Sequence, residues 1–363
     1  MKSLDEKTWA QLSAFGDDSP LCIKTTDSSI DGVRLIDDDE KSVPYVTRSD
    51  SNNGLARFVS PKNYEFGSDD GGCITVGLDT QTAFYQPHKF VTGQNIQIIT
   101  GESLNEDVAQ FMVPILRQQM TAKFNWGGNG ATLGRMKRLT VMLPVTDSGE
   151  LDYAYMAEYV QQKRAAMLDK YHKYVEARIA ELGELVEIPM LDEKEWNHFR
   201  MPEIFGLIQR GKRLKNADHV PGIVPYVSST ANNNGVDDYI EATPGTRAFG
   251  DCISLANSGS VGTAFYEPFE YVASDHVTAL KTEGMSKYVY LFLTSTIEKQ
   301  GSNFNFNREI NDARIKNMQI MLPVTDSGEP DYAYMEQYAK NMMLRKYQQY
   351  LEFINRQNVA EVE

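Results

Sequence analysis

The sequence predicts an α+β protein built from two similar β-rich domains, each followed by one long helix. Three observations predict this fold class. The chain has 363 residues, which is long for a single core. The segment MLPVTDSGELDYAYM at 142–156 returns at 321–335 with a single change, Leu151 to Pro330. After each copy the chain contains no Gly or Pro, over 152–182 and again over 331–363.

The repeat extends well beyond this fifteen-residue segment, here named the twin segment. The tetrapeptide VPYV occurs at 43–46 and 224–227, and TAFY at 82–85 and 263–266. Gly32-Val33-Arg34-Leu35 can also be set against Gly211-Lys212-Arg213-Leu214. The spacing stays near half the chain length, which indicates a tandem duplication, and two copies are too few for a solenoid.

The body of each copy predicts short strands. Val43–Thr47, Cys73–Val76 and Ile96–Thr100 are rich in β-formers and are separated by Gly, Asn and Pro. Cys73 and Cys252 occupy matching places, which suits small core residues. Three cysteines are too few for a disulfide framework, so a reducing cytoplasm fits.

The twin segment predicts a turn followed by a helix. Asp147 or Ser148, and Asp326 or Ser327, are candidate turn or capping residues. Apolar residues then recur at three- and four-residue steps, which predicts helices that pack on each other. The two stripes are Met156, Val160, Met167, Tyr171, Val175, Ile179 and Leu182, and Met335, Ala339, Met343, Tyr347, Leu351 and Ile354.

Net charge and sequence motifs exclude several classes of function. A formal net charge of −14 argues against binding nucleic acid by bulk electrostatics alone, but basic runs at 135–138 and 210–215 leave local basic faces possible. No apolar run is long enough to span a bilayer, and the charged first ten residues do not resemble an export signal. The Gly-rich run 125–130 lacks the Gly-Lys-Ser/Thr of a phosphate loop and differs between the copies, which favours a recognition loop.

Charge and motifs leave open a scaffold that binds only proteins and an enzyme hidden in the diverged bodies. The only nuclease-like pattern, Asp192-Glu193-Lys194, lies in a charged linker, where chance explains it, and the five histidines lack metal-ligand spacing.

One family matches the order of motifs. FGLIQRGKRL at 205–214, VPYV at 224–227, NNNG at 232–235, MLPV at 321–324 and the helix that follows resemble the target-recognition domains of restriction-modification specificity subunits. These are the HsdS chains of type I systems and the BcgI-like subunits. The resemblance covers nearly the whole chain. The first copy departs from it, with Ile23-Lys24-Thr25-Thr26 where the basic run of the second copy stands.

The resemblance implies pseudo-symmetric target-recognition domains at 1–142 and 184–321, separated by turns and spacer helices at 143–183 and 322–363 packed as an antiparallel coiled coil. Each domain would read half of a split site in double-stranded DNA. The helices would dock methyltransferase or fused restriction-methyltransferase subunits in two copies. The chain itself would be non-catalytic and cytoplasmic, with S-adenosylmethionine and Mg²⁺ held by its partners. A helix over 152–182 would span roughly 45 Å, or about 13 base pairs.

Residues that could contact DNA follow from their chemistry, because charges hold phosphates and polar side chains read base edges. For any single one of them an ordinary solvated loop or turn residue is the simpler explanation, and the loops are better candidates as sets. The candidates are Arg48, Ser49, Asn52, Asn53, Lys123, Arg135 and Lys137 in the first copy, and Arg210, Lys212, Arg213, Lys215, Ser229, Thr230, Asn232, Asn233, Asn234, Arg308, Arg314 and Lys316 in the second.

Two different half-sites need different reading surfaces, whereas two identical partners need the same docking surface twice. The twin segments are therefore candidate docking surfaces. The alternative is that packing between the body and the helix constrains them. The docking candidates are Asp152, Tyr153, Tyr155, Tyr159, Asp331, Tyr332, Tyr334 and Tyr338.

Overall fold

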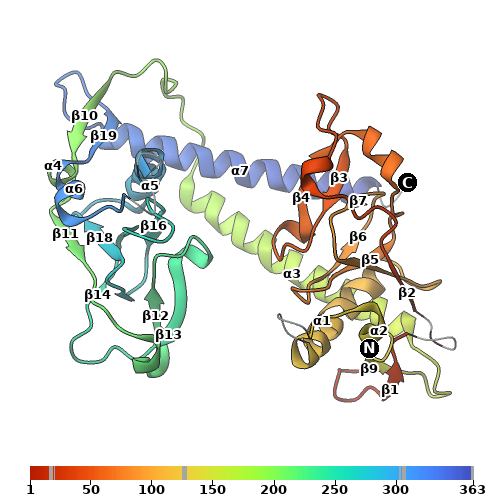
Figure 1. Ribbon diagram of the computed structural model, residues 1–363. Coiled ribbons are helices and arrows are strands. Elements are labelled where there is room, and N and C mark those ends of the chain that lie inside the picture. Colours follow the sequence, from red (N-terminus) through yellow and green to blue (C-terminus); the bar gives the residue numbers. More distant parts are fainter. Residues whose placement is uncertain (16–18, 20, 125–128, 302–303, 305–307, 361–363) are drawn as a thin grey trace. The chain divides into compact units, whose positions relative to one another are not determined.

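The computed structural model describes residues 1–15, 19, 21–124, 129–301, 304 and 308–360. The chain divides into two compact units, Met1–Lys173 and Tyr174–Glu363, and each is considered by itself (Figure 1). Within the described ranges, none of the helices combines the length and the hydropathy needed to cross a membrane.

Unit 1 contains three small sheets, ordered β1-β9, β2-β8-β5-β6 and β4-β3-β7. Its strands are β1 (Trp9–Ser13), β2 (Cys22–Thr25), β3 (Val43–Val46), β4 (Leu55–Val59), β5 (Cys73–Gly77), β6 (Ala83–Gln86), β7 (Val91–Thr92), β8 (Ile96–Thr100) and β9 (Thr140–Pro144). Its helices are η1 (Gly32–Arg34), η2 (Asn52–Gly54), η3 (Pro61–Phe66), α1 (Glu106–Lys123), α2 (Leu133–Met136) and the start of α3 (Tyr153–Leu182).

Unit 2 repeats this order, with sheets β10-β19, β11-β18-β15-β16 and β13-β12-β17-β14. Its strands are β10 (Trp196–Arg200), β11 (Leu207–Arg210), β12 (Pro221–Val227), β13 (Val236–Ile240), β14 (Ala248–Phe249), β15 (Cys252–Ala256), β16 (Ala264–Glu267), β17 (Tyr271–Ala273), β18 (Val277–Lys281) and β19 (Gln319–Pro323). Its helices are α4 (Met201–Ile204), η4 (Asn216–Asp218), η5 (Asn233–Gly235), α5 (Lys287–Gly301), α6 (Asp312–Asn317) and α7 (Tyr332–Ala360).

The two units also share strand register, so the predicted duplication of one fold is confirmed. Cys73 lies opposite Gln86 in β5–β6, and Cys252 lies opposite Glu267 in β15–β16. The expected strands at 43, 73 and 96 all form, and Cys73 and Cys252 are buried in β5 and β15. One difference is β14, which pairs with β17 where the first copy has an isolated bridge between Asp69 and Phe90.

One expected match between the copies is wrong. Gly211 directly follows β11, and a Cβ atom there would lie 2.2 Å from the carbonyl oxygen of Ser274. Gly32 instead opens η1, well past the end of β2. Strand pairing aligns Thr25, opposite Gln97, with Arg210, opposite Thr278. The first copy has a longer connection after this strand, so local similarity of letters misplaced the alignment.

The four-stranded sheet and one helix form the main core of each unit. In unit 1 the helix α1 packs on β5, β6 and β9, and it buries Met112, Leu116 and Met120. In unit 2 the helix α5 packs on β15, β16 and β19, and it buries Leu293 and Ile297. Apolar residues at these helical spacings put one stripe of each helix against a sheet.

The twin segments form identical joints between the body and the helix. In each, the chain leaves β9 or β19, makes a tight turn closed by Gly149 (φ 86°) or Gly328 (φ 82°), and enters α3 or α7. The helix caps are Asp152 and Asp331, whose carboxylates accept hydrogen bonds from the backbone amides of Tyr155 and Tyr334, three residues later. The turn was expected, but the capping residue lies several positions later than Asp147 or Ser148.

Within unit 2, the end of α3 packs antiparallel on α7. Leu182 lies in one buried cluster with Ala339 and Leu344, while Tyr174 contacts Tyr347 further along α7. The expected stripe holds for Val175 and Ile354, which are buried, but it is wrong at Met167, which is 72% exposed. The described residues of unit 1 cover only the beginning of α3, up to Val160, and leave Met167 exposed.

Candidate nucleic-acid interface

Both bodies present the same Asn-Asn-Gly turn on their surface. Asn52 and Asn53 have φ of 50° and 56°, and Asn233 and Asn234 have φ of 49° and 53°. This left-handed backbone is one that asparagine tolerates better than most residues. Gly54 and Gly235 close the turns at φ 76° and 79°. The four asparagine side chains are exposed, so the turns present amides that can donate to and accept from base edges.

A buried polar side chain lies behind each turn, on the strand against which the turn packs. In the first copy it is Gln86, whose amide nitrogen donates to the carbonyl of Asn53 at 3.0 Å. In the second copy it is Glu267, which is fully buried and whose pKa burial raises to about 7. The sequence shows this exchange in TAFYQ and TAFYE, but its position behind the turn requires the fold.

Beside the turns, the two copies carry different chemistry at matching positions. The Leu78 amide donates to the Asn95 carbonyl, and the Asn257 amide donates to the His276 carbonyl, which equates Asn95 with His276. In the first copy Arg48 pairs with Asp79, to which Asn95 also donates at 3.3 Å. A second ion pair there joins Arg117 to Asp50.

In the second copy the corresponding place holds Ser258 and His276, joined by a hydrogen bond of 2.5 Å. Sequence reasoning identified Arg48 but missed Asp79, Asn95, Ser258 and His276, because these residues lie on separate loops. Comparing the two copies position by position would have paired them as divergent.

A cavity of about 260 Å³ joins parts of the predicted second-copy site. Its lining brings the basic run together with the polar loop and with His276. Two carboxylates also line it, so its charge is mixed. The lining residues that carry these features are Arg213, Lys215, Ser229, Ser274, His276, Asp237 and Asp275. Such a cavity offers hydroxyls and cations to a phosphate or a base edge.

Not every predicted cation is presented in the same way. Arg210 is turned toward its own body, with its Nε atom 3.3 Å from the Asp312 carboxylate and a donation to the Ile310 carbonyl at 3.3 Å. Lys212 is exposed beside it. Ser49 is exposed, while Thr230 accepts from the exposed Asn232 at 3.1 Å and shapes its own loop.

A second basic group surrounds the chain before β19. A cavity of about 450 Å³ is lined by Arg308 and Arg314 together with Asn311 and Asn317, and Lys316 is exposed on α6. The counterparts before β9 are separate: Lys123 and Lys137 are exposed, whereas Arg135 donates to the Gly130 carbonyl at 3.0 Å. Residues 125–128 and 305–307 of the expected recognition loops lie outside the described residues.

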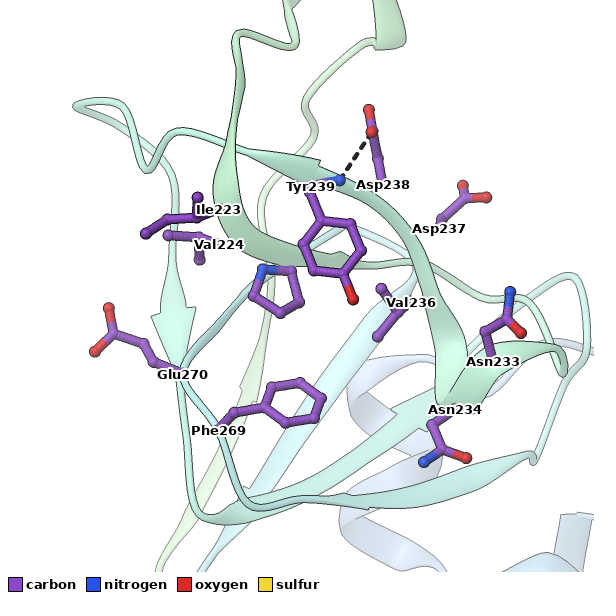
Figure 2. A pocket seen from close by; sticks show the side chains of 11 residues that line it. Ile223, Val224, Asn233, Asn234, Val236, Asp237, Asp238, Tyr239, Phe269 and Glu270 are labelled. Carbon is purple, nitrogen blue, oxygen red and sulfur yellow. Dashed lines mark hydrogen bonds between the residues drawn. The ribbon is translucent and has the colours of Figure 1, made fainter. Parts of the chain in front are cut away.

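The hairpin β12–β13 forms a different kind of surface on unit 2. Its hollow, of about 950 Å³, has the rings of Tyr239 and Phe269 on facing sides, with carboxylates at its rim (Figure 2). Ile223 beside it is 91% exposed. The rim carboxylates belong to Asp237, Asp238 and Glu270. Asn233 and Asn234 of the turn also line this hollow (Figure 2). Its carboxylates repel phosphate, so the side of the turn that faces the hollow is a poor phosphate contact.

The predicted docking residues occupy the joints. Tyr155 and Tyr334 are each only 6% exposed, and their hydroxyls donate to the carbonyls of Lys2 and Pro189. Tyr159 and Tyr338 pack edge-on against Phe111 and Phe292 at 5.5 and 5.6 Å. Packing therefore accounts for the repetition of these tyrosines.

The remaining docking candidates lie closer to the surface. Asp152 receives the Lys7 ammonium at 2.6 Å and Asp331 receives that of Lys194 at 2.9 Å. Tyr153 is half-buried and Tyr332 is 37% exposed. These side chains could take part in both the joint and a contact with a partner.

Other repeated residues of the twin segments have no packing role. Asp147, Glu150, Asp326 and Glu329 are exposed. The backbones of Glu150 and Glu329 bond to the hydroxyls of Thr146 and Thr325, but the four carboxylates make no hydrogen bond or ion pair in the part of the chain that the structure covers. Packing does not require carboxylates at these four positions, yet both copies keep them.

Comparison with known proteins agrees with this architecture. The family model of the type I restriction modification DNA specificity domain matches residues 32–184 and again 193–352. The chain therefore belongs to this family of DNA specificity proteins and carries the domain twice. It is 29% identical over 306 residues to the specificity subunit S.BcgI of a type II restriction enzyme from Heyndrickxia coagulans, covering 84% of this chain and 86% of that protein.

A solved structure shares the fold. The S subunit of a type I restriction-modification system from M. genitalium superimposes with a TM-score of 0.50 at 14% identity. The match covers 99% of this chain and 96% of that one. Two tandem α+β domains with their long helices are thus the architecture of this chain and of that subunit.

Proposed function

We propose that this chain reads a bipartite site in double-stranded DNA, one half-site with each body, as the specificity subunit of a restriction-modification complex. One observation carries the proposal. The two bodies share strand order, register and the Asn-Asn-Gly turn, yet differ beside that turn, with Arg48, Asp79 and Asn95 in one and Ser258 and His276 in the other. One scaffold with two sets of polar side chains suits two different half-sites.

Phosphate contacts come from exposed cations of the two bodies. They are Lys123, Lys137, Lys212, Arg213, Lys215, Arg308, Arg314 and Lys316. The net charge of −14 opposes binding to the phosphate backbone, so DNA binding depends on partners that add positive surface. The 30-residue helix α3 would be about 45 Å long, which suits a non-specific gap of several base pairs between half-sites.

The partners would be two methyltransferase or fused restriction-methyltransferase subunits, docked at the two joints. The exposed carboxylates of Asp147, Glu150, Asp326 and Glu329 support this, because both copies keep them although they form no hydrogen bond or ion pair among the described residues. Catalysis, S-adenosylmethionine and Mg²⁺ would belong to those subunits, and the chain would supply specificity.

The DNA proposal is tested by selecting bound duplexes from a random pool with the chain in complex with its methyltransferase. Two short defined sequences separated by an undefined gap are the expected result. Recovery of random sequence would favour a protein-binding scaffold and contradict the proposal. Replacing Arg213 with Ala should weaken binding to all sequences and reduce the salt slope by about one.

Docking is tested with Asp147→Lys and Asp326→Lys, alone and together. Each single variant should bind one methyltransferase instead of two, and the double variant none, because a lysine there repels a basic partner surface. Asp39→Lys, at an exposed acid outside the twin segments, is the matched control. Two bound subunits in all variants would contradict docking at this turn.

A further inference from the structure

The two Asn-Asn-Gly turns rest on different side chains. Gln86 is buried beneath the first turn, and its amide nitrogen donates to the Asn53 carbonyl at 3.0 Å and to the Thr75 hydroxyl at 3.1 Å. Asn53 in turn donates to the Tyr85 carbonyl at 2.8 Å. The amide of Gln86 thus ties the turn to the sheet at every ordinary pH, because it carries no titratable proton.

Glu267 occupies the place of Gln86 in the second copy. It lies opposite Cys252 as Gln86 lies opposite Cys73, and the Ser254 hydroxyl donates to its Oε1 atom at 2.8 Å. Its Oε2 atom is buried and has no hydrogen-bond partner among the residues described. A carboxylate has no proton to give to a backbone carbonyl, whereas the protonated acid has one.

The surroundings of Glu267 favour its uncharged form. Burial raises its pKa to about 7, against the weaker opposing effect of the Ser254 hydroxyl. The titratable groups that face it are Cys252 on β15 and Tyr271 on β17, and burial raises the pKa of both, so they stay neutral near pH 7. Within the described residues no basic side chain pairs with Glu267.

We propose that Glu267, as the uncharged acid, donates a hydrogen bond to the Asn234 carbonyl and holds the Asn232–Gly235 turn as Gln86 holds the first turn, so that its ionisation releases the turn. Glu267 is a positioning residue, because it acts on DNA only through the asparagines. Its effect on base reading rests on the proposed function, whereas its effect on the turn does not.

The two turns supply their own control for a hydrogen-exchange experiment on the full chain. The Gly54 amide donates to the Ser51 carbonyl at 2.9 Å and the Gly235 amide to the Asn232 carbonyl at 2.8 Å. Both amides lie in an Asn-Asn-Gly sequence, so their intrinsic exchange depends similarly on pH. The ratio of protection at Gly235 to that at Gly54 should fall about tenfold from pH 6 to pH 8, as the population of the acid falls.

Glu267→Gln is the decisive variant, since it installs the first-copy side chain. The ratio should then be independent of pH and equal to the low-pH value of the native chain. A flat ratio in the native chain, or an equal fall in Glu267→Gln, would overturn the proposal.

Binding of the methyltransferase complex to its selected duplexes separates this proposal from the proposed function. Discrimination at bases of the second half-site should weaken from pH 6 to pH 8 in the native complex but not in Glu267→Gln, while the first half-site stays constant. If the exchange ratio responds as expected but neither half-site is discriminated at any pH, the positioning role stands and the DNA-reading function fails.

Discussion

The joints of the two copies and the regions beside their Asn-Asn-Gly turns have diverged to very different degrees. At the joints, Lys7 meets Asp152 at 2.6 Å where Lys194 meets Asp331 at 2.9 Å. The ammonium of each lysine also lies over a tyrosine ring, 5.0 Å from the centroid of Tyr155 and 5.1 Å from that of Tyr334. Beside the turns, the ion pair of Arg48 with Asp79 in the first copy is matched by Ser258 and His276 in the second.

This difference separates two causes of sequence repetition. Tyr155 and Tyr334 repeat because each is enclosed and hydrogen-bonded within its own unit. Asp147 and Asp326 repeat although they are exposed and make no side-chain contact in the described chain. The first kind of repetition follows from folding alone, whereas no hydrogen bond or ion pair of the described side chains explains the second.

The largest effect is expected at the buried methionines of the joints. Met156→Ala and Met335→Ala should each lower the free energy of unfolding of its own unit by about 2–5 kcal/mol, because both side chains are fully buried. Hydrogen exchange resolved by unit measures the two losses. A loss at one joint and none at the other would break the equivalence of the copies, and the exposed Met167→Ala should cost little in either case.

Much of this fold was predictable from the sequence, because the repeat itself divides the chain. Strands at 43, 73 and 96 and both long helices follow from composition and periodicity, and strand register confirms that the two halves are alike. The stripe on α3 failed at Met167 because periodicity shows which face is apolar but not how far a partner covers it.

The candidate site was less predictable. The asparagine turns and the cations Arg213 and Lys215 were found, since their chemistry is visible locally. Asp79 and Asn95 were missed because their contacts join loops far apart in the chain. The exchange of Gln86 for Glu267 is visible as one letter, yet only the fold places it beneath a turn.

The reciprocal of that exchange sharpens the comparison. Gln86→Glu should destabilise unit 1 by about 3 kcal/mol above pH 7. A glutamate buried there as Glu267 is would have a pKa of about 7 in the native state and 4.5 in the unfolded state, and each pKa unit of that difference costs about 1.36 kcal/mol once the group is ionised. The unfolded state loses its proton first as pH rises, so the destabilisation grows from pH 4.5 to pH 7 and then levels.

Denaturant unfolding of Gln86→Glu at several pH values measures this loss, with Gln86→Asn as a control of similar polarity and no charge. A destabilisation that does not change with pH would mean that shape, and not the proton, distinguishes the two copies.

The asparagine turns predict base-specific effects of intermediate size. Asn233→Ala should relax discrimination at one base of the second half-site by about 1–3 kcal/mol, and Asn52→Ala at one base of the first, because each removes an amide that can pair with a base edge. Competition binding with single-base variants of the selected site checks both. Loss spread evenly over all bases would assign these asparagines to the backbone instead.

The smallest effect concerns the ion pairs of the joints. The pKa of Asp152 is held below its usual value by the Lys7 ammonium and by the Tyr155 amide. At Asp331, partial burial raises the pKa, but Lys194 and the Tyr334 amide outweigh it. Both carboxylates therefore contribute stability that is fully present above their unfolded pKa, near 3.8, and is lost as pH falls through the lower native value.

Lys7→Ala and Lys194→Ala should each cost about 1 kcal/mol at pH 7, since each removes a mostly buried charge-assisted hydrogen bond. Each variant should approach the native chain in stability as the pH falls below 3, where the carboxylate is protonated in both. Lys173→Ala, at an exposed pair with Asp169, is the matched control and should cost much less. Equal costs for all three lysines would mean that the joints owe their repetition to the aromatic packing, with the repeated ion pairs kept for contacts outside the chain.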